Sequence, residues 1–130
     1  MKASDLMIGD YISVKPSGMP IKVAAVHHKK VAYHAVINKL AWVRESLLEP
    51  IPLTQEIIEK NGLEKDNHGR LYGEYFDEDI NHDLEITVDS KTGEVWWSYN
   101  WDEYSIIRLR YVHQLQHALR LCRIEKEIEL

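Results

Sequence analysis

The segment that most constrains the fold of this chain is residues 84–99, whose pattern predicts a β-hairpin. Apolar and polar side chains alternate with a period of two on both sides of a short polar turn, which is typical of strands that turn one face to a core. Gly93 stands in that turn, where a tight connection needs a residue that tolerates positive φ. The apolar face of the hairpin must be covered by other segments. The predicted strand partners are Val88 with Val95, Ile86 with Trp97 and Leu84 with Tyr99.

The chain before the hairpin predicts a separate group of short strands. Several β-rich runs between residues 11 and 43 are joined by tight polar turns, which favours a small curled antiparallel sheet of the SH3-like barrel type. Pro50 and Pro52 restrict their preceding residues to extended conformations and mark a boundary. We therefore expect a β-barrel-like segment over residues 1–53 and a second segment over residues 54–130, either as two units or as one integrated domain.

The second segment is expected to combine a short helix with an antiparallel meander. Thr54 has the side chain of a helix N-cap, and Asn61 followed by Gly62 is typical of a helix end. The short helix leads into a second predicted hairpin and then into the central one, which gives a meander of about five strands. The other strands are expected at residues 63–66, 71–76 and 104–109.

The longest helical signal covers residues 111–123. Its apolar positions fall on one face at about 100° per residue, so this helix is the natural cover for the apolar side of the hairpin. Residues 124–130 alternate again and predict a final edge strand with acidic residues on its outer face. The predicted fold class is therefore α+β, with an SH3-like barrel followed by a meander that packs with one short and one longer helix.

His113 and His117 are candidate metal ligands because residues four apart on a helix share one side. A zinc protease would need a glutamate directly after the first histidine, and this chain has Gln114 there. Both histidines lie opposite the apolar stripe, on the face that is expected to be solvated. The pair therefore predicts either a metal site with a third ligand elsewhere or a polar face toward solvent or a partner.

Other patterns predict neither a cofactor nor a catalytic centre. Residues 77–83 alternate oxygen ligands like the start of a calcium loop, but His82 and Val88 replace the glycine and the glutamate that such a loop needs. Cys122 falls on the apolar face of the last helix and is expected to be an inert buried thiol. There is no phosphate-binding glycine loop, nucleophile elbow or catalytic acid pair in the sequence. The chain is therefore expected to be non-enzymatic.

Trp96 is the candidate centre of an interaction surface. Its neighbour Trp97 points to the covered face of the hairpin, so Trp96 points to the other face, where Trp101 and Tyr104 are expected to accompany it. Grouped Trp and Tyr side chains are typical of binding hot spots. The alternative is that the N-terminal segment or the first helix covers this second face.

Composition and charge limit the compartment and the partners. One cysteine in 130 residues favours a reducing compartment, and the absence of a long apolar run or a signal-like start predicts a cytoplasmic protein without a membrane anchor. The net charge is +3 over residues 1–50, −10 over 51–103 and +2 over 104–130. Nucleic acid is thus an unlikely partner unless it binds the basic first segment, where residues 27–30 form a basic turn.

Three motifs, in order along nearly the whole chain, carry a resemblance. They are Leu-x-Ile-Gly-Asp at residues 6–10, Glu-Pro-Ile-Pro-Leu-Thr at residues 49–54 before a short helix, and Tyr-Val-His-Gln-Leu-Gln-His-Ala-Leu at residues 111–119. The chain resembles a family of short proteins from gut Bacteroidales and their phages or mobile elements. The resemblance implies no activity, substrate or catalytic residue.

The sequence as a whole favours a non-enzymatic interaction or adaptor module with an unknown protein partner or with self-association. A metal-dependent enzyme or metal sensor that uses His113 and His117 is the first alternative. Nucleic-acid binding through the basic N-terminal segment is the second.

Overall fold

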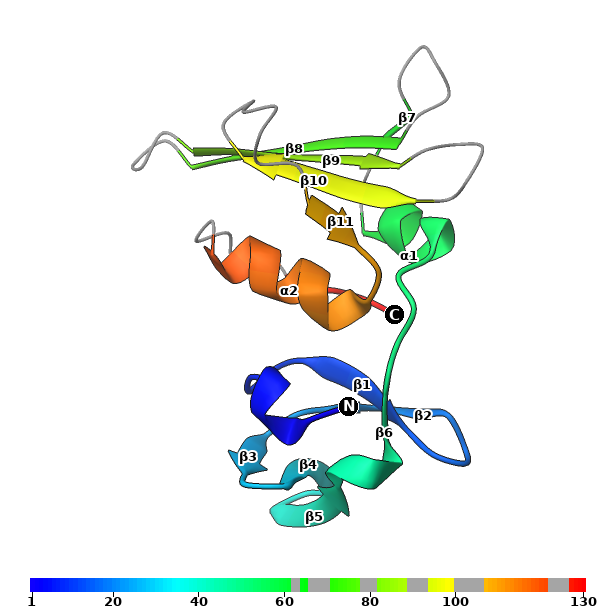
Figure 1. Ribbon diagram of the computed structural model, residues 1–130, viewed down its shortest axis with the longest axis vertical. Helices are drawn as coiled ribbons and strands as arrows, with labels where there is room; N and C mark the ends of the chain where they lie inside the picture. The colour runs from blue at the N-terminus through cyan, green and yellow to red at the C-terminus, as the bar shows by residue number, and fades with distance from the viewer. Residues whose placement is uncertain (62–63, 66–70, 78–81, 89–93, 100–106, 122–126) are drawn as a thin grey trace. The chain divides into compact units, whose positions relative to one another are not determined.

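The computed structural model describes residues 1–61, 64–65, 71–77, 82–88, 94–99, 107–121 and 127–130. These residues form an α+β structure with mostly antiparallel strands, as the sequence predicted (Figure 1). The chain divides into two units. The first unit comprises residues 1–51 and 111–113, and the second comprises residues 52–110 and 114–130.

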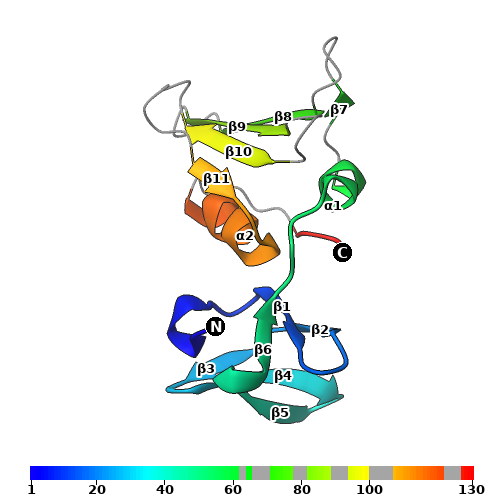
Figure 2. The ribbon, with the colours of Figure 1, turned by 45° about the vertical axis from the view of Figure 1, so that its right-hand side comes forward.

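The first unit is built from short strands and two 3₁₀ turns. Strand β1 pairs with β2 on one side and with β6 on the other, and β4 lies between β3 and β5 (Figure 2). Within this unit the described residues thus form two three-stranded sheets. The elements are η1 (Ala3–Asp5), β1 (Tyr11–Val14), β2 (Met19–Lys22), β3 (Ala25–His27), β4 (Lys30–Val36), β5 (Lys39–Arg44), η2 (Glu45–Leu47) and β6 (Leu48–Pro50).

The core of the first unit is made by alternate side chains of these strands. Ile12 of β1 and Val31 of β4 are both fully buried, and Tyr33 and Val43 pack against the same cluster. Residues two apart on a strand share one face, so β4 and β5 turn every second side chain inward. The buried members of the cluster are Ala3, Leu6, Ile12, Ile21, Val23, Val31 and Leu48.

A closed barrel of the SH3-like type expected for residues 1–53 is not shown, since the described strands of this unit form two open sheets. The chain passes from one sheet to the other without a break: Val23 N–H donates to Asp10 O at 2.8 Å, and Ala24 N–H donates to Ala32 O at 2.7 Å. Beyond that point β4 extends past the three-residue β3. Pro20 on β2 has no N–H to donate, which suits an edge strand rather than a closed ladder.

The second unit contains a five-stranded antiparallel sheet in the order β11-β10-β9-β8-β7 among its described residues (Figure 1). Strands β9 and β10 pair Val88 with Val95, Ile86 with Trp97 and Leu84 with Tyr99, so the predicted register is confirmed. The turn residue Gly93 lies outside the described residues. The strands are β7 (Glu64–Lys65), β8 (Leu71–Asp77), β9 (His82–Val88), β10 (Val95–Tyr99) and β11 (Ile107–Leu109).

Helix α1 (Gln55–Lys60) begins as the sequence predicted. The Thr54 hydroxyl accepts a hydrogen bond from Ile57 N–H at 3.3 Å, and Asn61 forms the C-cap. The second helix, α2, spans Val112–Leu121. The edge strand predicted for residues 124–130 is wrong for its described part, since residues 127–130 have no strand structure. The side chain of Asn61 bonds both Glu129 N–H and Glu129 O, and these bonds take the place of a strand ladder there.

Candidate functional site: the Trp42 face

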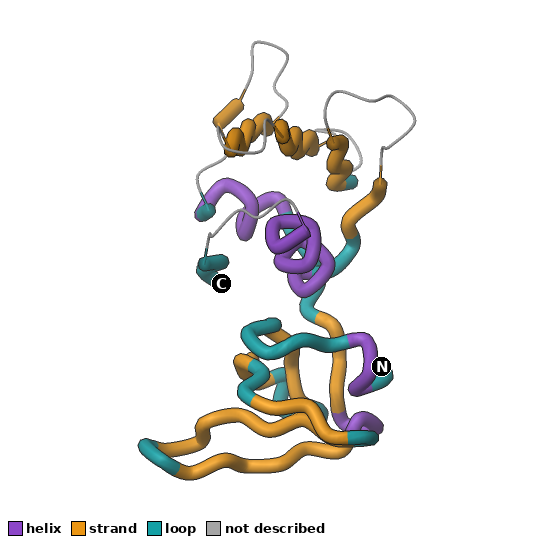
Figure 3. The backbone as a smooth tube through the Cα atoms, turned by 90° about the vertical axis from the view of Figure 1, so that its left-hand side faces the viewer, coloured by secondary structure: helices purple, strands orange, loops and turns teal. Residues whose placement is uncertain are grey.

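One face of the sheet formed by β3, β4 and β5 carries exposed cationic, aromatic and aliphatic side chains. Val31, Tyr33 and Val43 occupy the face toward the core, so the residues between them point the other way. In Figure 3 the strands of this unit are orange, and β4 and β5 form a long pair that ends in a teal turn. We call this outer side the Trp42 face; its exposed residues are His27, Lys30, His34, Leu40, Trp42 and Arg44.

The strand register places three basic side chains in one row next to the tryptophan. His27 pairs with Lys30, and Lys30 pairs with Arg44, so the row crosses all three strands. The Lys30 Nζ atom lies 4.9 Å from the centroid of the Trp42 ring. The His27 and Trp42 rings meet edge to face, with centroids 6.3 Å apart. With 47% of Trp42 exposed, the ring presents an open aromatic surface beside the Lys30 ammonium.

The basic row continues into a hollow of about 570 Å³ that is lined by residues 27–30 and 44–46. Glu45 N–H donates to Lys29 O at 2.9 Å, which ties η2 to the β3–β4 turn. The Glu45 carboxylate accepts a hydrogen bond from Ala3 N–H at 3.0 Å. Within the described ranges, Lys29, Lys30 and Arg44 form no ion pair, whereas Lys15 pairs with Glu49 at 3.2 Å. The lining therefore has three Lys and Arg side chains against one Glu, a net positive charge.

The far end of the β4–β5 hairpin carries exposed aliphatic side chains together with Asn38 and Lys39. Val36 and Leu40 are exposed, and Ile37, at the tip, is 91% exposed. The register shifts between His34 and Val36, and Asn38 adopts positive φ in the turn. Exposed aliphatic side chains that gather at one place are typical of contact surfaces. The Trp42 face thus has its basic end at the β3–β4 turn, and exposed aliphatic side chains lie beyond its other end at the hairpin tip.

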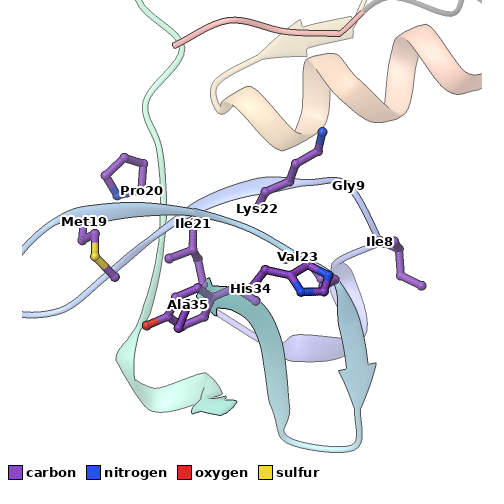
Figure 4. A pocket seen from close by; sticks show the side chains of 11 residues that line it. Ile8, Gly9, Met19, Pro20, Ile21, Lys22, Val23, His34 and Ala35 are labelled. Atoms are coloured by element: carbon purple, nitrogen blue, oxygen red, sulfur yellow. The ribbon is translucent and has the colours of Figure 1, made fainter. Parts of the chain in front are cut away.

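A second hollow of the first unit, about 620 Å³ in volume, lies between β2 and the end of β4 (Figure 4). Met19 and Ile21 point to one side of β2 in this view, and Pro20 and Lys22 point to the other. The hollow is lined by Met19–Ala24, Tyr33–Ala35, Ile8 and Gly9. Its lining is mostly apolar side chain and strand backbone, which offers few polar groups to orient a reacting molecule.

Trp96, the tryptophan singled out from the sequence, is half-buried. On β10 it lies between Thr87 of β9 and Arg108 of β11, and Arg108 forms an ion pair with Glu94 at 3.1 Å. Trp101 and Tyr104 lie outside the described residues. Sequence reasoning did not identify Trp42. The sequence does contain a signal for it. Residues 31–37 and 40–43 are both β-rich, and pairing them as a hairpin places Trp42 close to the basic turn at residues 27–30.

The expectation that both helical histidines face solvent is wrong for His113. His113 is 8% exposed on α2, and its ring stacks on that of Tyr111 with centroids 5.9 Å apart. His117, one turn later, is half-buried. Buried residues on α2 include polar Gln116 as well as the apolar stripe, so they span more than half of the helix circumference. Apolar periodicity identifies the stripe but not the polar residues buried beside it.

No group of three or more His, Cys, Asp or Glu side chains that could hold a metal ion occurs among the residues that the structure describes. Within the same ranges, no helix has both the length and the apolar character needed to cross a membrane. Comparison of the chain with protein-family models, with curated proteins and with solved structures gave no match in any of the three.

Proposed function

We propose that this chain is a non-enzymatic binding module that holds an anionic partner on the Trp42 face. The observation that carries the proposal is the row of His27, Lys30 and Arg44 beside an exposed indole. Lys30 and Arg44 form no ion pair with carboxylates of the described residues, so an anion can pair with them without displacing an internal partner. An exposed Trp next to Arg is also the composition of a binding hot spot.

The charge distribution supports the same location. The first unit has seven Lys and Arg against four Asp and Glu, whereas the second has nine against seventeen. A polyanion is therefore repelled by the second unit and attracted by the first. Three of the seven Lys and Arg side chains of the first unit, Lys29, Lys30 and Arg44, line one hollow at the Trp42 face.

Retention of the full chain on immobilised heparin, a general polyanion, tests this proposal. We expect the wild-type chain to bind at low salt in spite of its net charge of −5. The double variant Lys30→Ala, Arg44→Ala should elute at a clearly lower salt concentration, because each lost cation removes a counterion-releasing contact.

The matched control is Lys2→Ala, Lys15→Ala, which removes the same charge from the same unit but outside the Trp42 face. Lys2 lies before η1, and Lys15 already pairs with Glu49. This control should elute close to the wild type. Equal elution of the two double variants, or passage of the wild-type chain without retention, would show that the Trp42 face is not an anion-binding site.

A further inference from the structure

We infer that the anionic partner is a single-stranded nucleic acid, with a base stacked on Trp42 and phosphates on Lys30, Arg44 and the turn at residues 27–30. The inference rests on the proposed function and names its ligand class. Single strands are commonly bound by a positively charged groove together with aromatic side chains on which bases stack. The Trp42 face combines both elements on one sheet, with the indole beside the cations.

The position of the indole favours a nucleic acid over an acidic peptide. Trp42 lies within the basic part of the face, with Lys30 over its ring and His27 at 6.3 Å. A peptide carboxylate can pair with Lys30 and Arg44, but it brings no aromatic face to the ring. A nucleotide brings a phosphate and a π-face together, so one repeating unit satisfies the cation row and the indole at once.

The local geometry also allows a base to reach the ring. Lys30 holds its ammonium over Trp42 on a flexible four-carbon stem, so this group can move onto a phosphate when a base stacks there. The hollow beside Arg44 has a volume of about 570 Å³ and gives a phosphate room next to the basic turn. A duplex keeps its bases stacked inside, and would use the cations but not the indole.

The experiment measures fluorescence anisotropy of a labelled oligothymidine of about 12 nucleotides, which is within the usual site size of such proteins. A labelled abasic oligonucleotide of equal length supplies the same phosphates without bases, and labelled poly-glutamate supplies carboxylates. The chains are the full-length wild type, Trp42→Ala, Trp42→Phe, and the two double lysine and arginine variants described above.

We expect Trp42→Ala to weaken oligothymidine binding by about 5- to 150-fold, as the loss of one base–aromatic stack does. Trp42→Phe should retain most of the affinity, because it keeps a ring. The abasic strand should bind the wild type about as weakly as oligothymidine binds Trp42→Ala. Lys30→Ala, Arg44→Ala should make the dependence of log affinity on log salt shallower by about 1.4, or roughly 0.7 for each lost phosphate contact. The Lys2→Ala, Lys15→Ala control should leave that slope unchanged.

Three results would overturn the inference, and they differ in what they leave standing. Equal binding of the abasic and thymidine strands, with no effect of Trp42→Ala, would indicate charge alone and would leave the proposed function intact. Tighter binding of poly-glutamate than of oligothymidine, dependent on Trp42, would assign the face to an acidic protein partner. Failure of every polyanion to bind, with passage through heparin, would refute both proposals together.

Discussion

Asn61, at the end of α1, bonds the backbone of Glu129, and its neighbour Lys60 donates to Leu130 O. Its side-chain amide donates to Ile57 O at 2.7 Å and to Glu129 O at 2.8 Å, and its Oδ1 accepts from Glu129 N–H at 2.8 Å. Asn61 itself is buried, and Ile128, beside Glu129, is also buried. One amide therefore satisfies polar backbone groups of two segments that are far apart in sequence.

Replacing Asn61 by alanine should lower the free energy of unfolding by about 1–3 kcal/mol, because it leaves the partly buried N–H and C=O of Glu129 without the Asn61 side chain. Asn61→Asp should be at least as damaging, since a carboxylate can accept from Glu129 N–H but cannot donate to the two carbonyls. Urea denaturation of the full chain measures both changes. Glu56→Gln, an exposed substitution on the same helix, serves as the control and should change stability by less than about 0.5 kcal/mol. A loss at Asn61 no larger than that at Glu56 would contradict this role.

The sequence predicts the structural role of some single residues but not of others. Thr54 was predicted as an N-cap because capping depends on residues within one helical turn. The burial of His113 was not, because a polar residue is buried when neighbouring segments cover it, and periodicity does not report those neighbours. Trp42 was missed for a related reason: its link to Lys30 and His27 runs across strands and becomes visible only in the register.

At the scale of elements, the β9–β10 hairpin was predicted with its register because two local signals agree: the period-two alternation of each strand and the short polar turn between them. Period-two alternation fixes which side chains share a face, and a slip of one residue would turn all of them over. Residues 127–130 show the opposite case. Their alternation also suggested a strand, yet a strand needs a partner edge, and the described part of this segment bonds the Asn61 side chain instead.

The short helix α1 should depend on its cap, because six residues make too few internal hydrogen bonds to hold a helix alone. Thr54→Ala removes the oxygen that accepts Ile57 N–H, and we expect a loss of about 1 kcal/mol in the free energy of unfolding. Thr54→Ser keeps the acceptor and should stay near the wild type. The differences in the free energy of unfolding are measured from the urea midpoints of the three chains, with an unchanged slope of free energy against urea concentration. Equal destabilisation by both substitutions would mean that the threonine methyl group, rather than the cap, carries the effect.

At the scale of the whole molecule, sequence patterns predicted the α+β class but not how the N-terminal strands join. Closure of a barrel requires distant strand edges to meet in register, and composition and turn signals are local. In the first unit the same run of chain bonds Asp10 and then Ala32, so it passes from one open sheet to the next. The candidate site was missed for the same reason. Its basic side chains and its indole come from three strands and a turn, and only the pairing of these strands brings them together.

The opposite net charges of the two units lead to a prediction about the association rate of the nucleic-acid ligand inferred above. The second unit has a net charge of −8 and should slow the approach of a polyanion to the basic face of the first. Glu56→Gln, Glu59→Gln removes two exposed charges from α1 and should raise the oligothymidine association rate roughly twofold at about 10 mM salt. Lys60→Gln should lower that rate.

Both effects should vanish near 150 mM salt, because the Debye length falls from about 30 Å to about 8 Å and charges that do not touch the ligand are then screened. The dissociation rate should not change in any of these variants, since α1 lies outside the Trp42 face. Stopped-flow anisotropy at the two salt concentrations separates the two rates. A change in dissociation, or an effect that persists at the higher salt, would place α1 in direct contact with the ligand and would extend the binding surface beyond the first unit.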